Sequence, residues 1–402
     1  MNKSGYKTSF FLASRGITQG SRGSLYLTVL IIAMVFINMI FMPSIIMGFI
    51  KTYEDQFIAY NIGNILVSPK TDDEYIEDID ELLEKINSVP GVSRAAGHYS
   101  TGGTLHYKGY SLGTTIEVIK PNDERLVTDI YKKIKDGDYL GEGETGQIIM
   151  GIQVSGHKDT AEDMGPTLGY LNSGDSVTVD FTNGVTRELR VKGIIETGSF
   201  MTDQGVYITW DEMESVLGHP ITEGSNVIIK TDPDADEAAV KTQILRFGVA
   251  EKVQTWQDLL DEAMGRAIAD YAMLNSITIV VSLIIAVVVL FIVIMIKTLS
   301  SRRQIGVLKA IGLEKGIIIY NYVFQVLIMT TLGVILGVFV LEAMVAILTA
   351  FPFQFSDGTV TPVVMTADLV NNTILLFIVG FFAGYIPAWR VASEDIMIAM
   401  RA

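Results

Sequence analysis

Residues 271–296 read YAMLNSITIVVSLIIAVVVLFIVIMI and contain no charged side chain. About 20 apolar residues in a helix cross the roughly 30 Å hydrocarbon core of a bilayer, and this stretch is longer than that. It is apolar on every side of a helix, whereas a surface helix of a globular protein keeps one polar face. The stretch therefore predicts a transmembrane helix.

Three other uncharged runs have the same character. They are Gly23–Ile50, Gly316–Leu341 and Leu369–Trp389. With the third extended to its apolar end, the predicted membrane helices are 23–50, 271–296, 316–350 and 369–389. The first run exceeds the apolar length of a cleaved signal peptide, about 7–15 residues, so we expect it to remain as a membrane helix.

Charge along the chain predicts how these helices are oriented. Residues 1–22 carry four basic and no acidic side chains, and the loop 297–316 carries five basic side chains against Glu314. Residues 51–270 carry 19 Lys and Arg against 39 Asp and Glu, a net charge of 19 − 39 = −20. By the positive-inside rule, the segments 1–22 and 297–316 are expected in the cytoplasm.

The remaining segments then follow from alternation across the membrane. The acidic domain 51–270 and the loop 351–368 are expected outside the cytoplasm, and the tail 390–402 inside it. The predicted fold class is an α-helical membrane protein with four transmembrane helices plus a mixed α/β extracytoplasmic domain inserted between helices 1 and 2. We expect a multi-pass protein of the plasma (cytoplasmic) membrane with both termini in the cytoplasm.

The acidic segment is long enough to bury a core of its own, and the chain has no cysteine that could form a disulfide. Its patterns alternate between the strand and helix periods. Strands are predicted at 65–69, 177–181, 189–191, 205–209 and 227–230, and helices at 72–86, 210–217 and 236–248. Asn183-Gly184 is typical of a type I′ hairpin turn.

Two helical stalks are expected to join this domain to the first two membrane helices. One apolar stripe runs from Leu259 to Leu274 at helical spacing and enters the second membrane helix. Phe49, Ile50, Tyr53 and Phe57 continue one face of the first membrane helix. Plain linkers are the alternative.

Motifs for catalysis or cofactor binding are missing from the sequence. Gly151–Lys158 is the nearest approach to a phosphate-binding loop, but His157 stands where the lysine should be. The four histidines match no zinc frame, and the paired acids, such as Asp72-Asp73, are typical of a solvated surface, with a weak calcium site as the alternative. We expect no catalytic residue, no metal and no cofactor in this chain.

Polar groups within the membrane helices are sparse. Glu342 is the one acid in the third helix and is interpreted as an interfacial carboxylate. The pairs Gly333/Gly337 and Gly380/Gly384 permit close helix packing, either within the subunit or against a second copy.

The cytoplasmic loop contains a short basic helix. Ile305, Leu308 and Ile311 are interpreted as one apolar face, with basic side chains around it. Such a helix suits an anionic lipid surface or an acidic groove on a cytoplasmic protein.

Residues 302–312 read RRQIGVLKAIG, which resembles the R-R-x-I-G-x-L-K-A-I-G signature of FtsX-like permeases, the permease type of MacB and lipoprotein-release ABC transporters. Residues 384–401 are similar to the end of that family, although Glu394-Asp395-Ile396 departs from its usual Asp-Pro pair. In the acidic domain, residues 174–208 look like a MacB-like periplasmic core domain.

This resemblance implies a coupling helix that docks on a cytoplasmic ABC ATPase. The implied contact residues are Arg302, Arg303, Gln304, Ile305, Gly306, Leu308, Lys309, Ala310, Ile311 and Gly312. Ile305→Asp or Leu308→Asp would then abolish ATPase association while the protein still folds. The ATPase, which binds the ATP, is expected to be a separate chain, because only about 23 residues precede the first membrane helix.

The resemblance further implies a dimer with a second permease copy or paralogue, contact with membrane lipid, a possible extracytoplasmic partner and no nucleic acid. The implied function is export, lipoprotein or lipid extraction, or mechanotransmission, in which ATP hydrolysis moves the outer domain. A membrane-anchored sensor or scaffold without an ATPase, and a membrane-tethered enzyme, are the alternatives.

Overall fold

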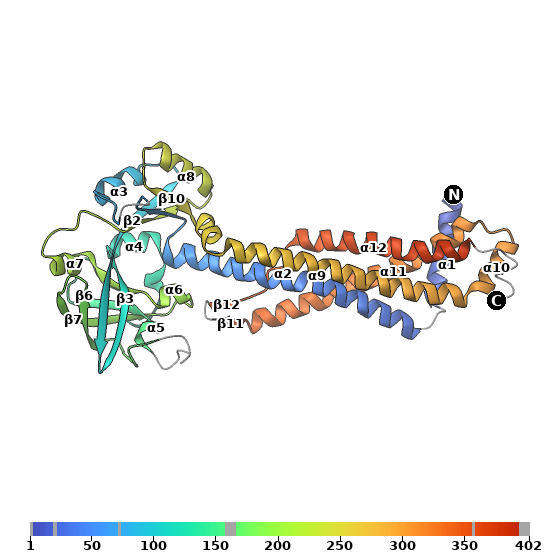
Figure 1. Cartoon of the computed structure of the whole chain (residues 1–402), viewed down its shortest axis with the longest axis horizontal. Coiled ribbons are helices and arrows are strands. Elements are labelled where there is room, and N and C mark those ends of the chain that lie inside the picture. The colour runs from blue at the N-terminus through green and yellow to red at the C-terminus, as the bar shows by residue number, and fades with distance from the viewer. Residues whose placement is uncertain (1–2, 19–21, 71–73, 157–165, 356–357, 394–402) are drawn as a thin grey trace. The chain divides into compact units, whose positions relative to one another are not determined.

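The computed structural model describes residues 3–18, 22–70, 74–156, 166–355 and 358–393 (Figure 1). The chain divides into two compact units. The helical unit comprises Met1–Phe49, Ala267–Phe353 and Val360–Ala402, and the α/β unit comprises Ile50–Arg266 and Gln354–Thr359.

The helical unit is built from long apolar helices. Its elements are α1 (Lys3–Thr18), α2 (Arg22–Gln56), α9 (Trp256–Ser300), α10 (Arg302–Ala310), α11 (Lys315–Ala350) and α12 (Thr366–Ala392). Within the described ranges, α2, α9, α11 and α12 are long and apolar enough to cross a membrane. These four helices include the four predicted membrane segments.

The core of the helical unit joins residues from all four long helices. Phe36, Leu290, Val326 and Leu376 are fully buried in one cluster. Lipid is as apolar as these side chains, so close van der Waals packing, more than exclusion from water, holds such helices together. Ser282 Oγ adds one interhelical hydrogen bond to Asn38 Oδ1 at 3.0 Å.

The α/β unit contains one mixed sheet and several short helices. The strands are β1 (Ile65–Ser68), β2 (Val92–Tyr107), β3 (Tyr110–Ile119), β4 (Ile134–Gly137), β5 (Gln147–Gly151), β6 (Ser176–Phe181), β7 (Thr186–Ile195), β8 (Val206–Thr209), β9 (Asn226–Thr231) and β10 (Lys252–Thr255). The helices are α3 (Ile79–Asn87), α4 (Pro121–Val127), α5 (Ile152–Ser155), α6 (Phe200–Asp203), α7 (Trp210–Leu217) and α8 (Glu237–Arg246). Short turns of π- and 3₁₀-helix lie at Phe57–Asn61 and Ile130–Lys133, and the small strands β11 (Phe353–Phe355) and β12 (Gly358–Val360) pair with each other.

The strand order is β10-β1-β9-β2-β3-β8-β5-β7-β4, with β6 pairing β2 and β7. Strand β2 joins the two ends of this sheet, because Val92–His98 pair with β9 and Tyr99–Tyr107 pair with β3. This long hairpin was not predicted from the sequence. Its turn at Lys108-Gly109 has positive φ at both residues, +44° and +90°, as a type I′ turn requires.

Two local predictions in the α/β unit were wrong. Helix α3 begins at Ile79 and not at residue 72, because the backbone of Ile76 pairs with Gly224 and cannot join the helix. In the β6–β7 hairpin only Gly184 has positive φ, so its turn is not type I′. The hairpin itself is confirmed, with Val177 opposite Leu189.

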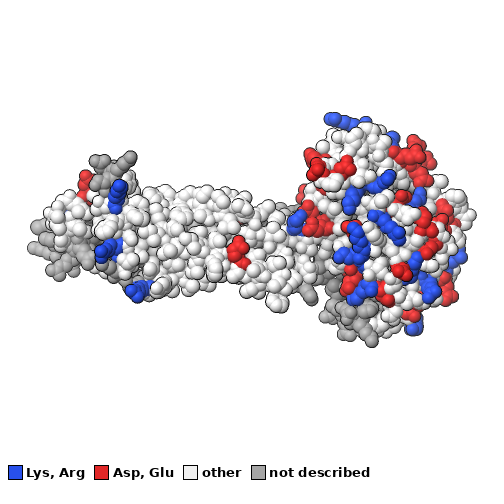
Figure 2. All heavy atoms as spheres, turned by 180° about the vertical axis from the view of Figure 1, so that it is seen from behind, with Lys and Arg blue, Asp and Glu red and all other residues white. Residues whose placement is uncertain are grey.

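Charged side chains distinguish the surfaces of the two units. Figure 2 shows Lys, Arg, Asp and Glu gathered over the α/β unit. On the same face the helical unit has long stretches without them, with basic side chains near one end. Such a surface suits contact with lipid.

Candidate functional site

The predicted coupling segment forms helix α10, which follows α9 after a single residue. Ile305 is 3% exposed and packs into the core of the helical unit, and Gly306 is buried beside it. Burying an isoleucine of this kind contributes roughly 1.5–3 kcal/mol, so Ile305 anchors α10 to the bundle.

The end of α10 is fixed by its backbone. Gly312 has φ of +96°, Gly312 N donates to Lys309 O at 3.0 Å, and Leu313 N donates to Leu308 O at 3.1 Å. These two bonds form a Schellman motif, in which a left-handed glycine stops the helix. Helix α11 then begins at Lys315, so a short link joins α10 to the bundle on this side.

Among the described side chains of α10 and its C-cap residue Ile311, the exposed apolar residues differ from the predicted apolar face. Val307 and Ile311 are exposed, Ile311 by 73%, and they lie four residues apart on one side of the helix. Ile305 and Ile311 do not share a face, because two steps of three residues leave them about 120° apart around the helix axis. Ile305→Asp would therefore test folding of the bundle, and Ile311 is the residue that a partner could touch.

The other predicted contact residues have the following positions. Leu308 and Lys309 are half-buried, and Ala310 and Gly312 are exposed. The side chains of Arg302, Arg303 and Gln304 lie outside the described part of the structure, as does the tail from residue 394. Contact of this set with an ATPase stays a prediction.

Both glycine pairs lie against neighbouring helices of the same unit. A Cβ on Gly333 would lie 2.5 Å from Ile32 Cγ2, and one on Gly337 would lie 2.8 Å from Phe36 Cδ1, both on α2. Gly380 and Gly384 of α12 face α11 in the same way, near Thr330 and Val326. The structure thus assigns these four glycines to packing within the subunit.

Helix α1 lies in the basic N-terminal segment and packs on α11. The rings of Tyr6 and Tyr320 are 5.2 Å apart, and those of Phe10 and Phe324 are 5.8 Å apart. Ser9 Oγ donates to Ile317 O at 3.1 Å. Aromatic residues spaced four apart in α1 were the signal for this contact.

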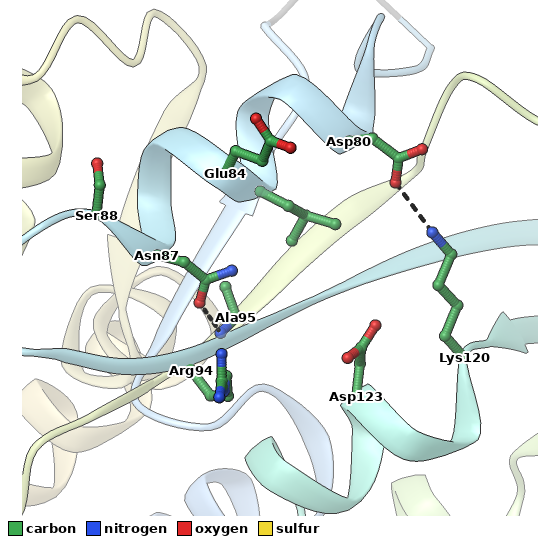
Figure 3. Close-up of a pocket in the computed structure, with 9 residues that line it drawn as sticks. Asp80, Glu84, Asn87, Ser88, Arg94, Ala95, Lys120 and Asp123 are labelled. Atoms are coloured by element: carbon green, nitrogen blue, oxygen red, sulfur yellow. Dashed lines mark hydrogen bonds and ion pairs between the residues drawn. The ribbon is translucent and has the colours of Figure 1, made fainter.

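The α/β unit has an open pocket of about 690 Å³ lined by α3, β2 and the start of α4 (Figure 3). Lys120 Nζ lies 2.9 Å from Asp80 Oδ1, and Arg94 lies across the pocket from Glu84. Asp123 adds one more acid. Positive and negative side chains largely offset one another, so this pocket offers a polar surface contact without strong preference for a cation.

The segment that approached a phosphate-binding loop does not form one. Gly151 ends β5 and precedes the four-residue helix α5, and a side chain there would collide with the backbone of Asp203. The loop is therefore packed on protein where a phosphate would have to sit. His157 and Lys158 lie outside the described residues.

Other candidates for chemistry are also structural. Among the described residues, no group of three His, Asp or Glu is placed to hold a metal ion. Asp72 and Asp73, which suggested a calcium site, lie outside the described residues. Glu342 is exposed on α11 and does not face the interior of the bundle.

One histidine of the α/β unit is buried beside a carboxylate. His98 Nε2 on β2 lies 2.6 Å from Glu124 Oε2 on α4, and Thr128 Oγ1 donates to Glu124 Oε1 at 2.7 Å. Burial alone would lower the pKa of His98, but the charge and hydrogen bond of Glu124, with a smaller effect of Glu117, raise it above 6.5. This pair ties α4 to the sheet.

We expect the region around His98 to become less stable as the pH rises, because His98 then loses its proton. Between about 6.5, where the unfolded histidine titrates, and its raised folded pKa, the folded state holds the extra proton. The stabilisation is complete below that window and is lost as the pH rises through the folded pKa. Hydrogen exchange of the full chain, corrected for intrinsic rates, should show weaker protection of β2 and α4 above the window than at about pH 6.

Two variants make this measurement specific. His98→Gln should flatten the pH dependence of protection. His106→Gln should leave it unchanged, because His106 is exposed and pairs at 3.0 Å with the exposed Asp180. Equal pH dependence in wild type and His98→Gln would contradict the assignment.

Comparison with known proteins gives two family matches. Residues 25–247 match the MacB-like periplasmic core domain, and residues 276–396 match the FtsX-like permease C-terminal region. The first covers nearly all of α2 and most of the α/β unit. The second covers most of α9, together with α10, α11 and α12.

Individual relatives are distant. A macrolide export ATP-binding/permease protein MacB of Acinetobacter baylyi is 20% identical over 327 residues, which are 79% of this chain and 47% of that protein. A protein with the same description from Bordetella avium is 23% identical over 166 residues, 41% of this chain and 25% of that protein. The chain spans less than half the length of these curated relatives.

Two solved structures are similar to part of the chain. The periplasmic region of MacB from Actinobacillus actinomycetemcomitans is 12% identical, with a TM-score of 0.37, and the match covers 55% of this chain and 98% of that one. The extracellular domain of the noncanonic ABC-type transporter YknZ from Gram-positive bacteria is 16% identical, with a TM-score of 0.34, and the match covers 48% and 98%.

Proposed function

The chain belongs to the family that joins a MacB-like periplasmic core domain to an FtsX-like permease region, and from this we propose that it is the permease subunit of an ABC transporter, driven by a cytoplasmic ATPase. Permease components of this family are generally not catalytic themselves. ATP would be bound and hydrolysed by the ATPase, and this chain would convert that cycle into movement.

The observation that carries the proposal is the construction of α10. Its buried residue Ile305 and its glycine stop at Gly312 hold the helix to the bundle, while Val307 and Ile311 remain exposed. Exposed apolar residues on a rigidly held helix are suited to insertion into a groove of another protein. A helix that is held in this way passes a push from that protein into α9 and α11.

Movement of the bundle would be transmitted to the α/β unit through α2 and α9. Helix α9 is unbroken from Trp256 to Ser300 and contains both the predicted stalk and the predicted membrane span. Helix α2 likewise extends past its predicted span to Gln56. We propose that these two helices transmit the ATPase cycle to the α/β unit, with or without transfer of a substrate through the membrane.

The proposed orientation follows the charges. The basic segments around α1 and α10 would lie in the cytoplasm with both termini, and the α/β unit would lie outside it. We propose a dimer with a second copy or a paralogue. The client belongs to one of three classes: an exported small molecule or peptide, an extracted lipid or lipoprotein, or an envelope enzyme that responds to the movement.

The test is affinity purification of the tagged full chain from mild detergent, followed by identification of the proteins that copurify. Recovery of an ABC ATPase supports the proposal, and a second permease sequence would show that the dimer contains a paralogue. Recovery of extracytoplasmic proteins without an ATPase would instead support the membrane-anchored sensor or scaffold.

A further inference from the structure

The helical unit contains a cavity of about 730 Å³ at the end where α10 lies. It is lined by α1, the beginning of α2, the end of α9, α10 and the beginning of α11. Its lining on α11 runs from Ile318 to Met329, a distance of about 16 Å along the helix. The cavity therefore extends from the end of the helical unit where α10 lies into the apolar stretch of α11.

One cation faces this cavity without a counter-charge. Lys297 is half-buried, and its Nζ donates to Gly16 O at 3.1 Å. Among the residues that the structure describes, the cavity lining includes no acidic side chain and Lys297 forms no ion pair. An ammonium group withdrawn from water needs an anion or several polar partners, and one carbonyl does not supply either.

A buried acceptor lies beside the same glycine. Gln325 is 2% exposed, its Nε2 donates to Asn321 Oδ1 at 3.3 Å, and its Oε1 has no hydrogen-bond partner within the described part of the chain. A Cβ on Gly16 would lie 2.9 Å from Gln325 Nε2, so Gly16 brings Lys297 and Gln325 to one place. An unsatisfied buried acceptor costs about 1–3 kcal/mol, which a donor group of a ligand would recover.

The rest of the lining is mainly apolar. Apolar side chains line the cavity beside Lys297 and Gln325; they include Leu25, Val293, Ile296, Leu308 and Met329. A ligand that complements this cavity carries a negative charge for Lys297, a hydrogen-bond donor for Gln325 Oε1 and a hydrocarbon chain for the apolar lining. A free phosphate ion has no hydrocarbon chain, and water carries no negative charge.

We propose that this cavity binds an anionic phospholipid whose headgroup carries hydroxyl groups, such as a phosphatidylglycerol. Its phosphate would lie against Lys297, a headgroup hydroxyl would donate to Gln325 Oε1, and its acyl chain would cover the apolar lining. Since the lipid would touch α1, α9, α10 and α11, it would fix α10 to the bundle. The proposal rests on the helices spanning a bilayer and does not depend on an ATPase.

The test compares lipid retention by the full chain. The protein is reconstituted with phosphatidylglycerol or with phosphatidylcholine of the same acyl chains, extracted in mild detergent, and examined by native mass spectrometry. Wild type should retain phosphatidylglycerol at least about tenfold more than phosphatidylcholine, as expected for hydrogen bonds to a charged group. Equal retention, or retention of neither lipid, would overturn the proposal.

The decisive variant is Gln325→Glu. It has the same shape, places a carboxylate beside Lys297 and should reduce phosphatidylglycerol retention about tenfold, while the thermal stability in detergent is kept. Lys297→Gln should have the same effect on retention. Lys315→Gln is the matched control, because Lys315 lies outside the cavity and stacks on Trp389 at 5.6 Å.

Two further outcomes separate this proposal from its alternatives. Unchanged retention in Gln325→Glu would place the lipid elsewhere on the protein. Displacement of the lipid by excess inorganic phosphate would show that the cavity recognises the ion alone. If the ATPase copurifies while lipid retention fails, the lipid proposal is overturned and the proposed function stands.

Discussion

The variant Ile311→Asp is expected to lose the ATPase while the permease remains folded. Ile311 is 73% exposed on α10, so a carboxylate there is hydrated in the free chain. In a docked complex the change removes an apolar contact and buries an unpaired charge, together on the order of 3–5 kcal/mol. That corresponds to association weaker by at least about a hundredfold.

The measurement is copurification of the ATPase together with the permease-stimulated rate of ATP hydrolysis in detergent. Ile311→Leu should retain both. Leu245→Asp is a matched control, since Leu245 is an exposed residue of α8 in the α/β unit and should change neither. Normal ATPase recovery with Ile311→Asp would show that α10 does not dock through this face.

The variant Ile305→Asp gives a different result and shows why burial has to be known. Ile305 lies in the core of the helical unit, and an aspartate there would be a buried, unpaired charge. We expect little folded protein from this variant. Loss of the ATPase with Ile305→Asp would therefore carry no information about docking.

The sequence predicted that α10 forms, but it did not predict which side of α10 faces the bundle. Residues 302–312 predicted a short basic helix, and Gly312 is the residue that ends it. Which side of so short a helix faces the bundle depends on tertiary contacts such as the burial of Ile305 in the core of the helical unit, and the local pattern does not fix these contacts. Apolar residues stand at 305, 307, 308 and 311, so more than one side of α10 is apolar enough to pack against the bundle.

In the α/β unit, prediction followed the strength of local patterns. The hairpin β6–β7 alternates clearly and was predicted, and α7 was predicted with its bounds, since Thr209 caps it by accepting from Glu212 N. Strand β2 was missed because it contains Ser, Gly and His between its apolar residues. Pairing with β3, β6 and β9 stabilises it, and these partners cannot be read from one segment.

The cavity at Lys297 and Gln325 could not be predicted from the sequence. In the sequence, Lys297 is one of five basic residues in the loop 297–316, and Gln325 is one polar residue within the third predicted membrane helix. Only the position of Gly16 on α1 brings them together. Helix α1 is also the segment whose contact with the bundle had no signal beyond a few aromatic residues.

Substitution of alanine in the glycine pair of α11, Gly333 and Gly337, is also expected to have a large effect on stability. Alanine is a better helix former than glycine by about 1 kcal/mol, so Gly→Ala in an open helix position is neutral or stabilising. At Gly333 the added methyl group would lie 2.5 Å from Ile32 Cγ2 and 2.7 Å from Ile32 Cβ, and both atoms belong to a fully buried side chain. We expect Gly333→Ala to destabilise the helical unit by about 1–3 kcal/mol.

The effect can be measured as the temperature at which half of the full chain leaves its monodisperse peak in detergent. Gly333→Ala should lower this temperature by roughly 2–12 °C. Gly23→Ala, on α2 with no atom within 4 Å of the new Cβ, should not lower it. Ile32→Ala with Gly333→Ala should lose less than the two single changes added together, because the shortened side chain removes one of the two close contacts. Additive losses would mean that α2 and α11 do not meet at this glycine.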